Sequence, residues 1–358
     1  MELGKKYIGI DIFSGAGGLS LGAIKAGINI PIAIEKESNA AKTFKRNHPE
    51  TIVITEDILK IDPNSFDIFE PLIVFGGPPC QGFSLSNSKT RNKENENNNL
   101  YQEFIRFIRE LKPKWLLFEN VEGIISFNKG DTVKQIKRNF EELGYTVNYR
   151  VLSATDFGVP QDRNRFILVG NREGICFEFP DKIKSKVSVM EAISDLPTLI
   201  NGQKDEALPY KNNTASSYAK KMRNGSEVSR QNFVSKNNEL VVERYKHIKP
   251  GQNWKAIPDY LMQNYKNKDN CHSGIYKRLN PDFPSVVISN YRKNMLIHPE
   301  QDRGLSVREA ARIQSFPDDF IFEGSLMHIQ QQIGNAVPPL LAEAIFKQII
   351  SQECRNQN

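Results

Sequence analysis

Cysteine is scarce in this chain, with four in 358 residues, and long apolar runs are missing. No two of the cysteines form a Cys-x-x-Cys pair; they are Cys80, Cys176, Cys271 and Cys354. This spacing argues against a disulfide framework or a structural zinc site, and it is typical of a reducing compartment. No apolar segment reaches the roughly 18 residues that a membrane-spanning helix needs. We therefore expect a cytoplasmic protein without a metal and without a membrane anchor.

The excess of positive charge is also small, at +6. It is compatible with a polyanionic partner, but many unrelated proteins share it. Its distribution is more informative, because residues 203–293 are rich in Lys, Arg, Asn and Tyr. Such a segment suits a surface that faces nucleic acid, and it equally suits a solvated variable region.

Residues 1–170 alternate short apolar runs with amphipathic stretches, which predicts βαβ units and a doubly wound, mostly parallel sheet. The expected helices lie near 17–26, 38–47, 101–111 and 131–143. The expected strands are Tyr7–Ile10, Ile30–Ile34, Ile52–Ile54, Leu72–Phe75, Trp115–Phe118 and Phe166–Val169.

The strand–helix rhythm is lost after Pro180. Residues 181–300 carry scattered turns and short β-like runs such as 286–289, which predicts a second, smaller and irregular β-rich domain. Regularity returns in a helix at 306–314, where Ser306 is a plausible N-cap with Glu309 three residues on, and in a last helix at 340–350. The polar run 89–99 predicts either a mobile lid or a plain surface loop.

The most informative motif is Gly76-Gly-Pro-Pro-Cys80-Gln-Gly-Phe-Ser84, directly after an apolar run. Two prolines fix two φ angles and remove two backbone donors, so the strand must end there. The loop therefore places one thiol at the carboxyl end of the sheet, where open α/β folds hold their ligands. Taken alone, Cys80 is as well explained as a small buried core residue.

A second motif, Asp11-Ile-Phe-Ser-Gly15-Ala-Gly-Gly18, joins the first strand to the first helix. Glycines there let the backbone approach a ligand, and a helix N-terminus presents free N–H groups. Glu35 and Asp57 end the next two strands, where such folds place acids for ribose hydroxyls. A helix cap or a surface charge is the alternative for each acid, but together they predict a nucleoside site.

Glu119, in Glu-Asn-Val, ends another apolar strand, so its carboxylate is expected at the same sheet edge as Cys80. Such a group could hydrogen-bond a heterocyclic nitrogen; a helix-capping acid is the alternative. Arg163 and Arg165, in Gln-x-Arg-x-Arg, alternate as they enter a strand, so we expect both on one face. That face would suit an anion or position a carboxylate.

Near the C-terminus, the chain carries Arg308-x-x-x-Arg-x-Gln-x-Phe-Pro317 and Gly334-Asn-Ala-Val-Pro-Pro339. With these motifs in this order, the chain resembles the DNA (cytosine-5)-methyltransferases of bacterial type II restriction–modification systems. The resemblance spans residues 8–350. It implies a Rossmann-like class I fold that uses S-adenosylmethionine, with a catalytic domain of residues 1–180 and 318–358. Residues 181–317 would be the target-recognition domain.

The resemblance also implies the chemistry. Cys80 would add to C6 of a cytosine flipped out of duplex DNA, while Glu119 holds N3 and the 4-amino group, with Arg163 and Arg165 in support. C5 would then accept the methyl group, after which the C5 proton and Cys80 leave. The loop from Ser84 to Asn99 would close over the DNA. Cofactor-binding residues carried over are Phe13, Ser14, Gly15, Gly17, Gly18, Leu19, Glu35, Lys36, Asp57, Ile58, Gly77, Pro79, Leu100, Asn335, Ala336 and Val337.

The expected partner is double-stranded DNA, bound by a monomer, with a restriction endonuclease as a functional partner only. A tRNA cytosine-5 methyltransferase of the same fold is the first alternative. That branch typically carries Pro-Phe-Thr where this chain has Gly82-Phe-Ser84. A non-catalytic DNA-binding regulator is the second, although Cys80, Glu119 and both arginines are present. A nicotinamide dehydrogenase explains neither Cys80 nor residues 334–339.

Overall fold

The computed structural model describes residues 7–68, 71–79, 100–211, 215–265, 274–289, 291 and 295–356. The chain divides into two compact units. The first comprises residues 1–157, 164–182 and 339–358, and the second comprises residues 158–163 and 183–338. Residues 158–163 and 318–338 were expected in the catalytic domain, but they pack with the second unit. The functional assignment of the two parts stays a prediction.

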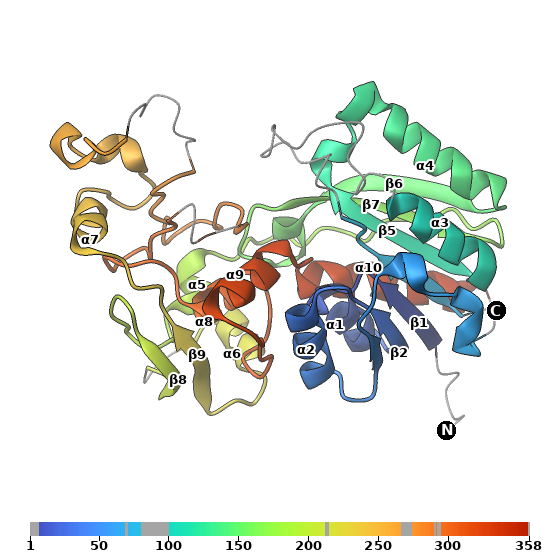
Figure 1. Cartoon of the computed structure of the whole chain (residues 1–358), viewed down its shortest axis with the longest axis horizontal. Helices are drawn as coiled ribbons and strands as arrows, with labels where there is room; N and C mark the ends of the chain where they lie inside the picture. The colour runs from blue at the N-terminus through green and yellow to red at the C-terminus, as the bar shows by residue number, and fades with distance from the viewer. Residues whose placement is uncertain are drawn as a thin grey trace. The chain divides into compact units, whose positions relative to one another are not determined.

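The first unit is built on a seven-stranded sheet with the order β3-β2-β1-β4-β5-β7-β6 (Figure 1). Strands β1 to β5 pair in parallel, while β7 is antiparallel to both of its neighbours. This mostly parallel sheet confirms the expected fold class. The strands are β1 (Tyr7–Ile12), β2 (Ile28–Ile34), β3 (Ile52–Ile54), β4 (Ile73–Gly76), β5 (Trp115–Val121), β6 (Thr146–Ser153) and β7 (Asn164–Asn171).

Helices cover both faces of this sheet. Phe104 of α3 and Phe140 of α4 pack on Phe118 of β5, with ring centroids 5.4 and 6.4 Å from it. On the other face, Phe346 of α10 packs on Phe75 of β4 at 4.9 Å. The red α10 returns beside the blue α1 from the far end of the chain (Figure 1). The helices are α1 (Gly18–Lys25), α2 (Ser38–Asn47), α3 (Leu100–Leu111), α4 (Asp131–Glu142) and α10 (Pro339–Arg355).

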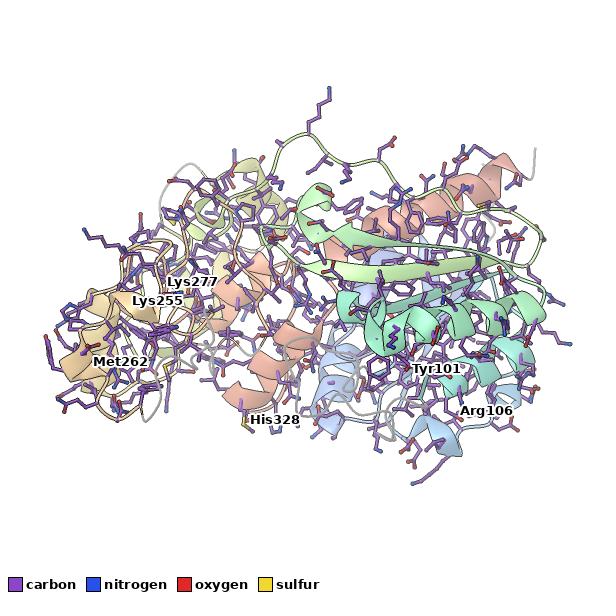
Figure 2. The ribbon with its side chains drawn as sticks, turned by 90° about the horizontal axis from the view of Figure 1, so that it is seen from above. Tyr101, Arg106, Lys255, Met262, Lys277 and His328 are labelled. Carbon is purple, nitrogen blue, oxygen red and sulfur yellow. The ribbon has the colours of Figure 1, made fainter. Side chains whose placement is uncertain are left out.

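The second unit is less regular. Strands β8 and β9 pair antiparallel and form its two-stranded sheet. Helix α8, buried along its whole length, packs against β9 and α5. A separate apolar cluster includes Tyr245, Trp254, Met262 and Tyr276; Met262 is labelled in Figure 2. The elements are α5 (Val189–Ile193), β8 (Lys204–Pro209), α6 (Ser217–Arg223), β9 (Val228–Phe233), α7 (Glu239–Lys246), α8 (Val307–Ile313) and α9 (Leu326–Asn335).

Several expectations need correction at the level of single elements. The strand at 166–169 exists but is antiparallel, because it returns from β6, a strand that the sequence pattern did not predict. The run 286–289 forms no strand; only Ser285 bridges to Gln161. Helix α9 was not predicted. Among the described residues, no helix combines the length and the apolar character needed to cross a membrane.

Candidate active site

The turn after β1 has a backbone that requires its glycines. The φ angle is +55° at Gly15 and +95° at Gly17, a region that side chains other than glycine rarely adopt. The amides of Phe13 and Ser14 both donate to the Ile34 carbonyl, at 3.1 and 2.9 Å, and fasten the turn to the end of β2. Within the part of the chain that the structure describes, no side chain caps the first turn of α1. Its amide groups are therefore available to a polar ligand.

Glu35 shapes this turn from the end of β2. Its carboxylate accepts the Gly15 amide and the Glu37 amide, both at 2.7 Å. Burial raises the pKa of Glu35, and these backbone hydrogen bonds oppose the rise. Beside it, the buried Ser14 hydroxyl has no hydrogen-bond partner within the described residues. A Cβ built on Gly15 would meet no described atom within 4 Å. The turn therefore combines open space with an unused polar group.

Asp57 lies at the end of β3 and begins the short 3-10 helix η1 (Ile58–Lys60) by accepting the Leu59 amide at 3.1 Å. The Lys36 ammonium contacts the same carboxylate at 2.6 Å and lowers the pKa of Asp57. Arg106 of α3, labelled in Figure 2, donates to the carbonyls of Ile58 and Ile61 at 2.9 and 3.1 Å. The sequence analysis missed Arg106, because one arginine on an amphipathic helix carries no signal.

Cys80 lies outside the described residues, as does the whole loop up to Asn99 with its expected lid. The residues just before it are described. Gly76 lies so close to β1 that an added Cβ would be 1.8 Å from the Ile12 carbonyl oxygen. The Asn120 side-chain amide donates to the Pro78 carbonyl at 3.2 Å. Asn120 therefore fixes the start of the Pro-Pro-Cys segment, a role that the sequence analysis did not assign to it.

Glu119 and Arg165 meet at the same edge of the sheet. The Arg165 Nε atom lies 2.8 Å from Oε1 of Glu119, and both side chains are about nine-tenths buried, with 10% and 11% exposed. The register pairs Val121 with Arg165 and Glu119 with Ile167, so the two are diagonal neighbours on one face. Gly77 leaves room for the pair, because a Cβ there would be 2.4 Å from Glu119 Oε2.

Arg163 has a different environment from Arg165. It belongs to the second unit, and its side chain is 1% exposed. Its guanidinium donates to the carbonyls of Ile288 and Gly334 at 3.2 and 2.8 Å. Within the same unit, Asn335 ends α9 and is exposed, while Ala336 and Val337 are buried.

The remaining predicted cofactor residues lie in the first unit. Gly18 and Leu19 are buried at the start of α1, and the half-buried Leu100 begins α3. The structure thus brings Glu119 to Arg165 and Gly77, and it brings Glu35 to the glycine turn. Arg163, Asn335, Ala336 and Val337 belong to the second unit.

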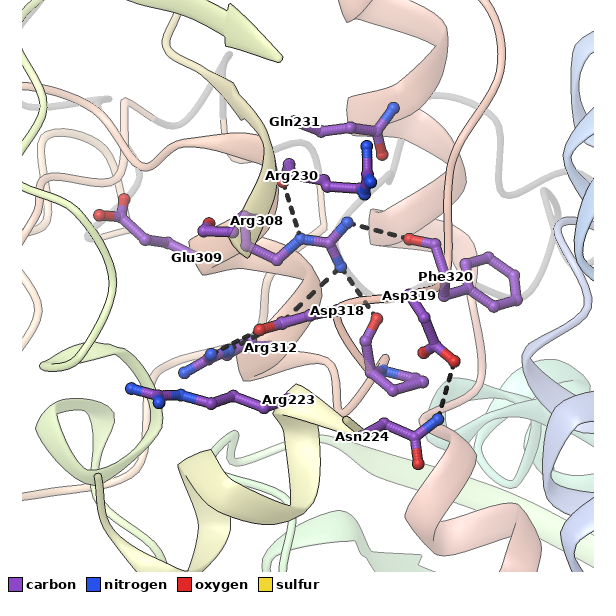
Figure 3. A network of polar contacts seen from close by, with 12 residues as sticks. Arg223, Asn224, Arg230, Gln231, Arg308, Glu309, Arg312, Asp318, Asp319 and Phe320 are labelled. Carbon is purple, nitrogen blue, oxygen red and sulfur yellow. Dashed lines mark hydrogen bonds and ion pairs between the residues drawn. The ribbon is translucent and has the colours of Figure 1, made fainter. Parts of the chain in front are cut away.

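The arginines of the Arg308-to-Pro317 motif form a buried network in the second unit (Figure 3). Arg308 donates to the carbonyls of Arg230, Pro317 and Phe320 at 2.9 to 3.0 Å. Arg312 pairs with Asp318 and with Asp195, the closest contacts being 2.6 and 2.5 Å. Both arginines are fully buried. Their role is therefore to hold this unit together.

Comparisons with known proteins agree with this architecture. The family model for C-5 cytosine-specific DNA methylases matches residues 7–351. The Type II methyltransferase M.DdeI of Desulfomicrobium norvegicum is 37% identical over 95% of this chain and 88% of its own length. The Type II methyltransferase M1.HphI of Haemophilus parahaemolyticus is 34% identical over 95% of this chain and 86% of its own length.

Solved structures show the same fold. One, described as a DNA modification methyltransferase encoded within a prophage (E. coli), superposes with a TM-score of 0.79 at 26% identity. The match covers 97% of this chain and 99% of that one. The sheet edge that holds Glu119 with Arg165 agrees with this assignment. The matched family model and these relatives show that this chain belongs to the C-5 cytosine-specific DNA methylase family and is a DNA (cytosine-5)-methyltransferase of the bacterial type II kind.

Proposed function

We propose that this enzyme uses S-adenosylmethionine to methylate C5 of a flipped-out cytosine in a short duplex sequence, through a covalent bond from Cys80 to C6. The observation that carries the proposal is the buried carboxylate of Glu119, held by Arg165 and flanked by Gly77. That carboxylate lies at the edge from which the Pro-Pro-Cys segment begins. A nucleophile and an acid–base group at one sheet edge are what covalent catalysis on a pyrimidine requires.

Each residue of this edge has a distinct task in the proposed reaction. The Cys80 thiolate adds to C6, and the electron pair of the C5–C6 double bond moves toward C5 and N3. Glu119 holds a proton at N3 and accepts a hydrogen bond from the 4-amino group, which stabilises the charge that develops in the ring. After C5 has gained its methyl group, its proton passes to a base, the C5–C6 double bond re-forms, and Cys80 leaves as the thiolate. Arg165 fixes the Glu119 carboxylate through the 2.8 Å contact. We propose that Arg163, which belongs to the second unit, supports the site indirectly, through the backbone carbonyls that it contacts.

The residues around the glycine turn fit the proposed methyl donor. The free amides of α1 suit its carboxylate, and Glu35 suits its ribose hydroxyls. Asp57 and Ile58 would flank the adenine, with Phe13 against it. Open space at Gly15 and the unused Ser14 hydroxyl are what a ligand-binding turn would show. When bound, S-adenosylmethionine supplies an electrophilic methyl group. We propose that Asn335, Ala336 and Val337 bind its methionine end.

A cytosine inside a duplex hides its C6 face, so the target base must leave the stack before Cys80 can reach it. We propose that side chains of residues 181–300 read the bases and that their Lys and Arg residues contact phosphates. The methylation would protect host DNA from a partner endonuclease.

The test is methyl transfer from labelled S-adenosylmethionine to mixed-sequence duplex DNA, with tRNA as a parallel substrate and bisulfite sequencing to locate the modified sites. Cys80→Ser should abolish turnover and leave binding of DNA and cofactor largely intact, because a serine hydroxyl is a far weaker nucleophile than a thiolate. A duplex containing 5-fluorocytosine should trap a covalent adduct on the native protein only. Normal methylation by the serine variant would exclude Cys80 as the nucleophile, and methylation of tRNA alone would favour the RNA-modifying branch.

A further inference from the structure

The residues of the Gln-x-Arg-x-Arg motif belong to different units. Arg165 reaches Glu119 in the first unit, whereas Arg163 and Gln161 lie in the second. Arg163 is 1% exposed, and Gln161 is not exposed at all. Both therefore act inside the protein, on groups that they contact directly.

Those groups include both backbone polar groups of one residue, Ile288. The Ile288 carbonyl accepts from Arg163 at 3.2 Å, and the Ile288 amide donates to Gln161 Oε1 at 2.9 Å. Ser285, three residues earlier, exchanges backbone hydrogen bonds of 2.8 and 2.9 Å with Asp162 and Pro160. Segment 285–289 belongs to no regular strand, so these bonds define its path.

The same side chains also hold the C-terminal end of α9. Arg163 donates to the Gly334 carbonyl at 2.8 Å. The Gln161 side-chain amide donates to the side chain of Gln314. Gln314 in turn donates to the carbonyls of Ile333 and Ala336 at 2.9 and 2.7 Å. Residues from three motifs that are far apart in the sequence therefore form one buried hydrogen-bonded group.

Close backbone packing completes this junction. A Cβ on Gly334 would be 1.8 Å from the Ser289 carbonyl oxygen, so only glycine permits the observed approach. Ser289 and Asn335, which flank the contact, are both exposed, and Val287 is 42% exposed. The junction thus fixes the spacing of two exposed positions, one in the proposed target-recognition part and one in the proposed cofactor motif.

We infer that Arg163 is a positioning residue that locks segment 286–289 to the Gly334–Ala336 end of α9 and thereby couples cofactor binding to DNA recognition. This inference deepens the proposed function and rests on it. Arg163 acts through two backbone carbonyls, to which its two terminal guanidinium nitrogens donate. Lysine is a poor substitute, because a single ammonium on a flexible stem does not reproduce the planar fork that spans two acceptors. Loss of the Arg163 guanidinium would leave the buried carbonyls that it contacts without this donor.

The experiment compares Arg163→Lys, Gly334→Ala and their combination with the wild-type protein. Arg308→Lys is the matched control, because Arg308 is another fully buried arginine of this unit that donates to backbone carbonyls. Titration calorimetry gives the affinity for S-adenosylhomocysteine without DNA. Fluorescence anisotropy gives the affinity for a duplex carrying the mapped methylation site, with and without S-adenosylhomocysteine. Single-turnover methyl transfer at saturation gives the rate of the chemical step, and hydrogen exchange reports on the amides of 285–289.

We expect Arg163→Lys to weaken binding of S-adenosylhomocysteine by about tenfold, which corresponds to about 1.4 kcal/mol. If the two binding events are coupled as inferred, S-adenosylhomocysteine should strengthen DNA binding by the wild-type protein. This effect should shrink in Arg163→Lys, and amides 285–289 should exchange faster. Gly334→Ala should give the same pattern, and the double variant should be no worse than the poorer single variant, because both changes break one junction. Gly334→Ala also carries the test if Arg163→Lys does not fold.

Three results would overturn the inference. One is a slower saturated single turnover by Arg163→Lys with unchanged affinities, which would place Arg163 on the reacting base. Another is an equal loss of both affinities in Arg308→Lys, which would show general destabilisation. The last is that Arg163→Lys and Gly334→Ala both show the affinities and the hydrogen exchange of an active wild-type protein. A wild-type protein that neither binds S-adenosylhomocysteine nor methylates DNA would instead overturn the proposed function, and the inference with it.

Discussion

At the scale of single residues, Glu119 shows how one carboxylate is prepared for its task. It is buried, it contacts Arg165 at 2.8 Å, and the absence of a side chain on Gly77 leaves space next to its second oxygen. Asn120, the next residue, turns away from it to hold the Pro78 carbonyl. Two consecutive residues of β5 thus provide the proposed acid–base group and a hydrogen bond to the segment that leads to Cys80.

We predict that Glu119→Gln slows methyl transfer by a factor of about 10²–10⁴, the usual range for a lost acid–base group. The amide can still form hydrogen bonds, so binding of the base should survive better than the rate. Single-turnover kinetics measure this effect. Glu122→Gln is the matched control, because Glu122 follows β5 and is exposed. A wild-type rate for Glu119→Gln would assign ring activation to another residue.

Asp11 is the other residue whose environment is unusual. It is fully buried in β1, accepts the Ser20 hydroxyl at 2.6 Å through Oδ2, and has no partner for Oδ1 among the described residues. Burial raises the pKa of Asp11 to about 8, against the opposing hydrogen bond from Ser20. The folded protein therefore keeps this carboxyl protonated at pH values where the unfolded chain, with a pKa of about 3.9, has lost the proton.

The raised pKa predicts that Asp11 makes the folded state less stable as the pH rises from about 4 to about 8, because the unfolded chain binds fewer protons in that window. The contribution cannot exceed about 1.4 kcal/mol per pH unit. Asp11→Asn keeps an acceptor for Ser20 and removes the titration. The free energy of unfolding of this variant, relative to that of the wild type, should therefore increase as the pH rises from about 4 to about 8. Urea unfolding at several pH values measures the difference, and the exposed Asp131→Asn serves as control. A constant difference would contradict the raised pKa.

At the scale of elements, α8 begins with a complete capping box. The Glu309 amide donates to the Ser306 hydroxyl at 3.2 Å, and the Ser306 amide donates to the Glu309 carboxylate at 2.8 Å. The sequence pattern predicted this cap. Because α8 is buried along its length and carries Arg308 and Arg312, its first turn sets the position of the network in Figure 3.

We predict that Ser306→Ala lowers the free energy of unfolding by about 1 kcal/mol, the typical effect of a lost N-cap. Ser325→Ala is the matched control, because the exposed Ser325 precedes α9 without a side-chain cap bond to the backbone, and its hydroxyl contacts the His328 ring at 2.7 Å. Its effect should stay within about 0.5 kcal/mol, as for most surface changes. Chemical denaturation measures the free energy of unfolding of both variants. Equal decreases in the two variants would show that the capping bond does not stabilise the protein.

Strand β7 is the element that sequence reasoning misjudged, and the error has a mechanistic consequence. An antiparallel strand begins where its parallel-sheet neighbours end. Arg165, at the start of β7, therefore lies at the carboxyl edge of β5, next to Glu119. The direction of a strand depends on how the chain connects it to its neighbours in the sheet. A short apolar run predicts a strand but not its direction.

At the scale of the whole molecule, Glu119, Arg165 and the glycine turn belong to the first unit, and the irregular segments after residue 183 belong to the second. We predict that sequence specificity resides in the second unit. Grafting residues 183–338 onto M.DdeI of Desulfomicrobium norvegicum should transfer the recognition sequence of this protein, and the reciprocal chimera is the control. Bisulfite sequencing of DNA modified by each chimera reads the outcome. A chimera that keeps the recipient's recognition sequence would place specificity in the first unit, with the loop after Cys80 as the first segment to test.

The amino-acid sequence by itself determined the fold class, the boundaries of most strands and helices in the first unit, and the family. Each of these follows from local information: apolar periodicity, glycine and proline at turns, and motifs of fixed spacing. Only the tertiary structure decided that Arg163 and Arg165, with one residue between them, have different partners. It also decided that Arg106 holds the segment after Asp57 and that Asn120 holds the Pro-Pro turn. A long side chain chooses its partner by packing among elements that are distant in sequence, and the spacing of residues along the chain does not encode that choice.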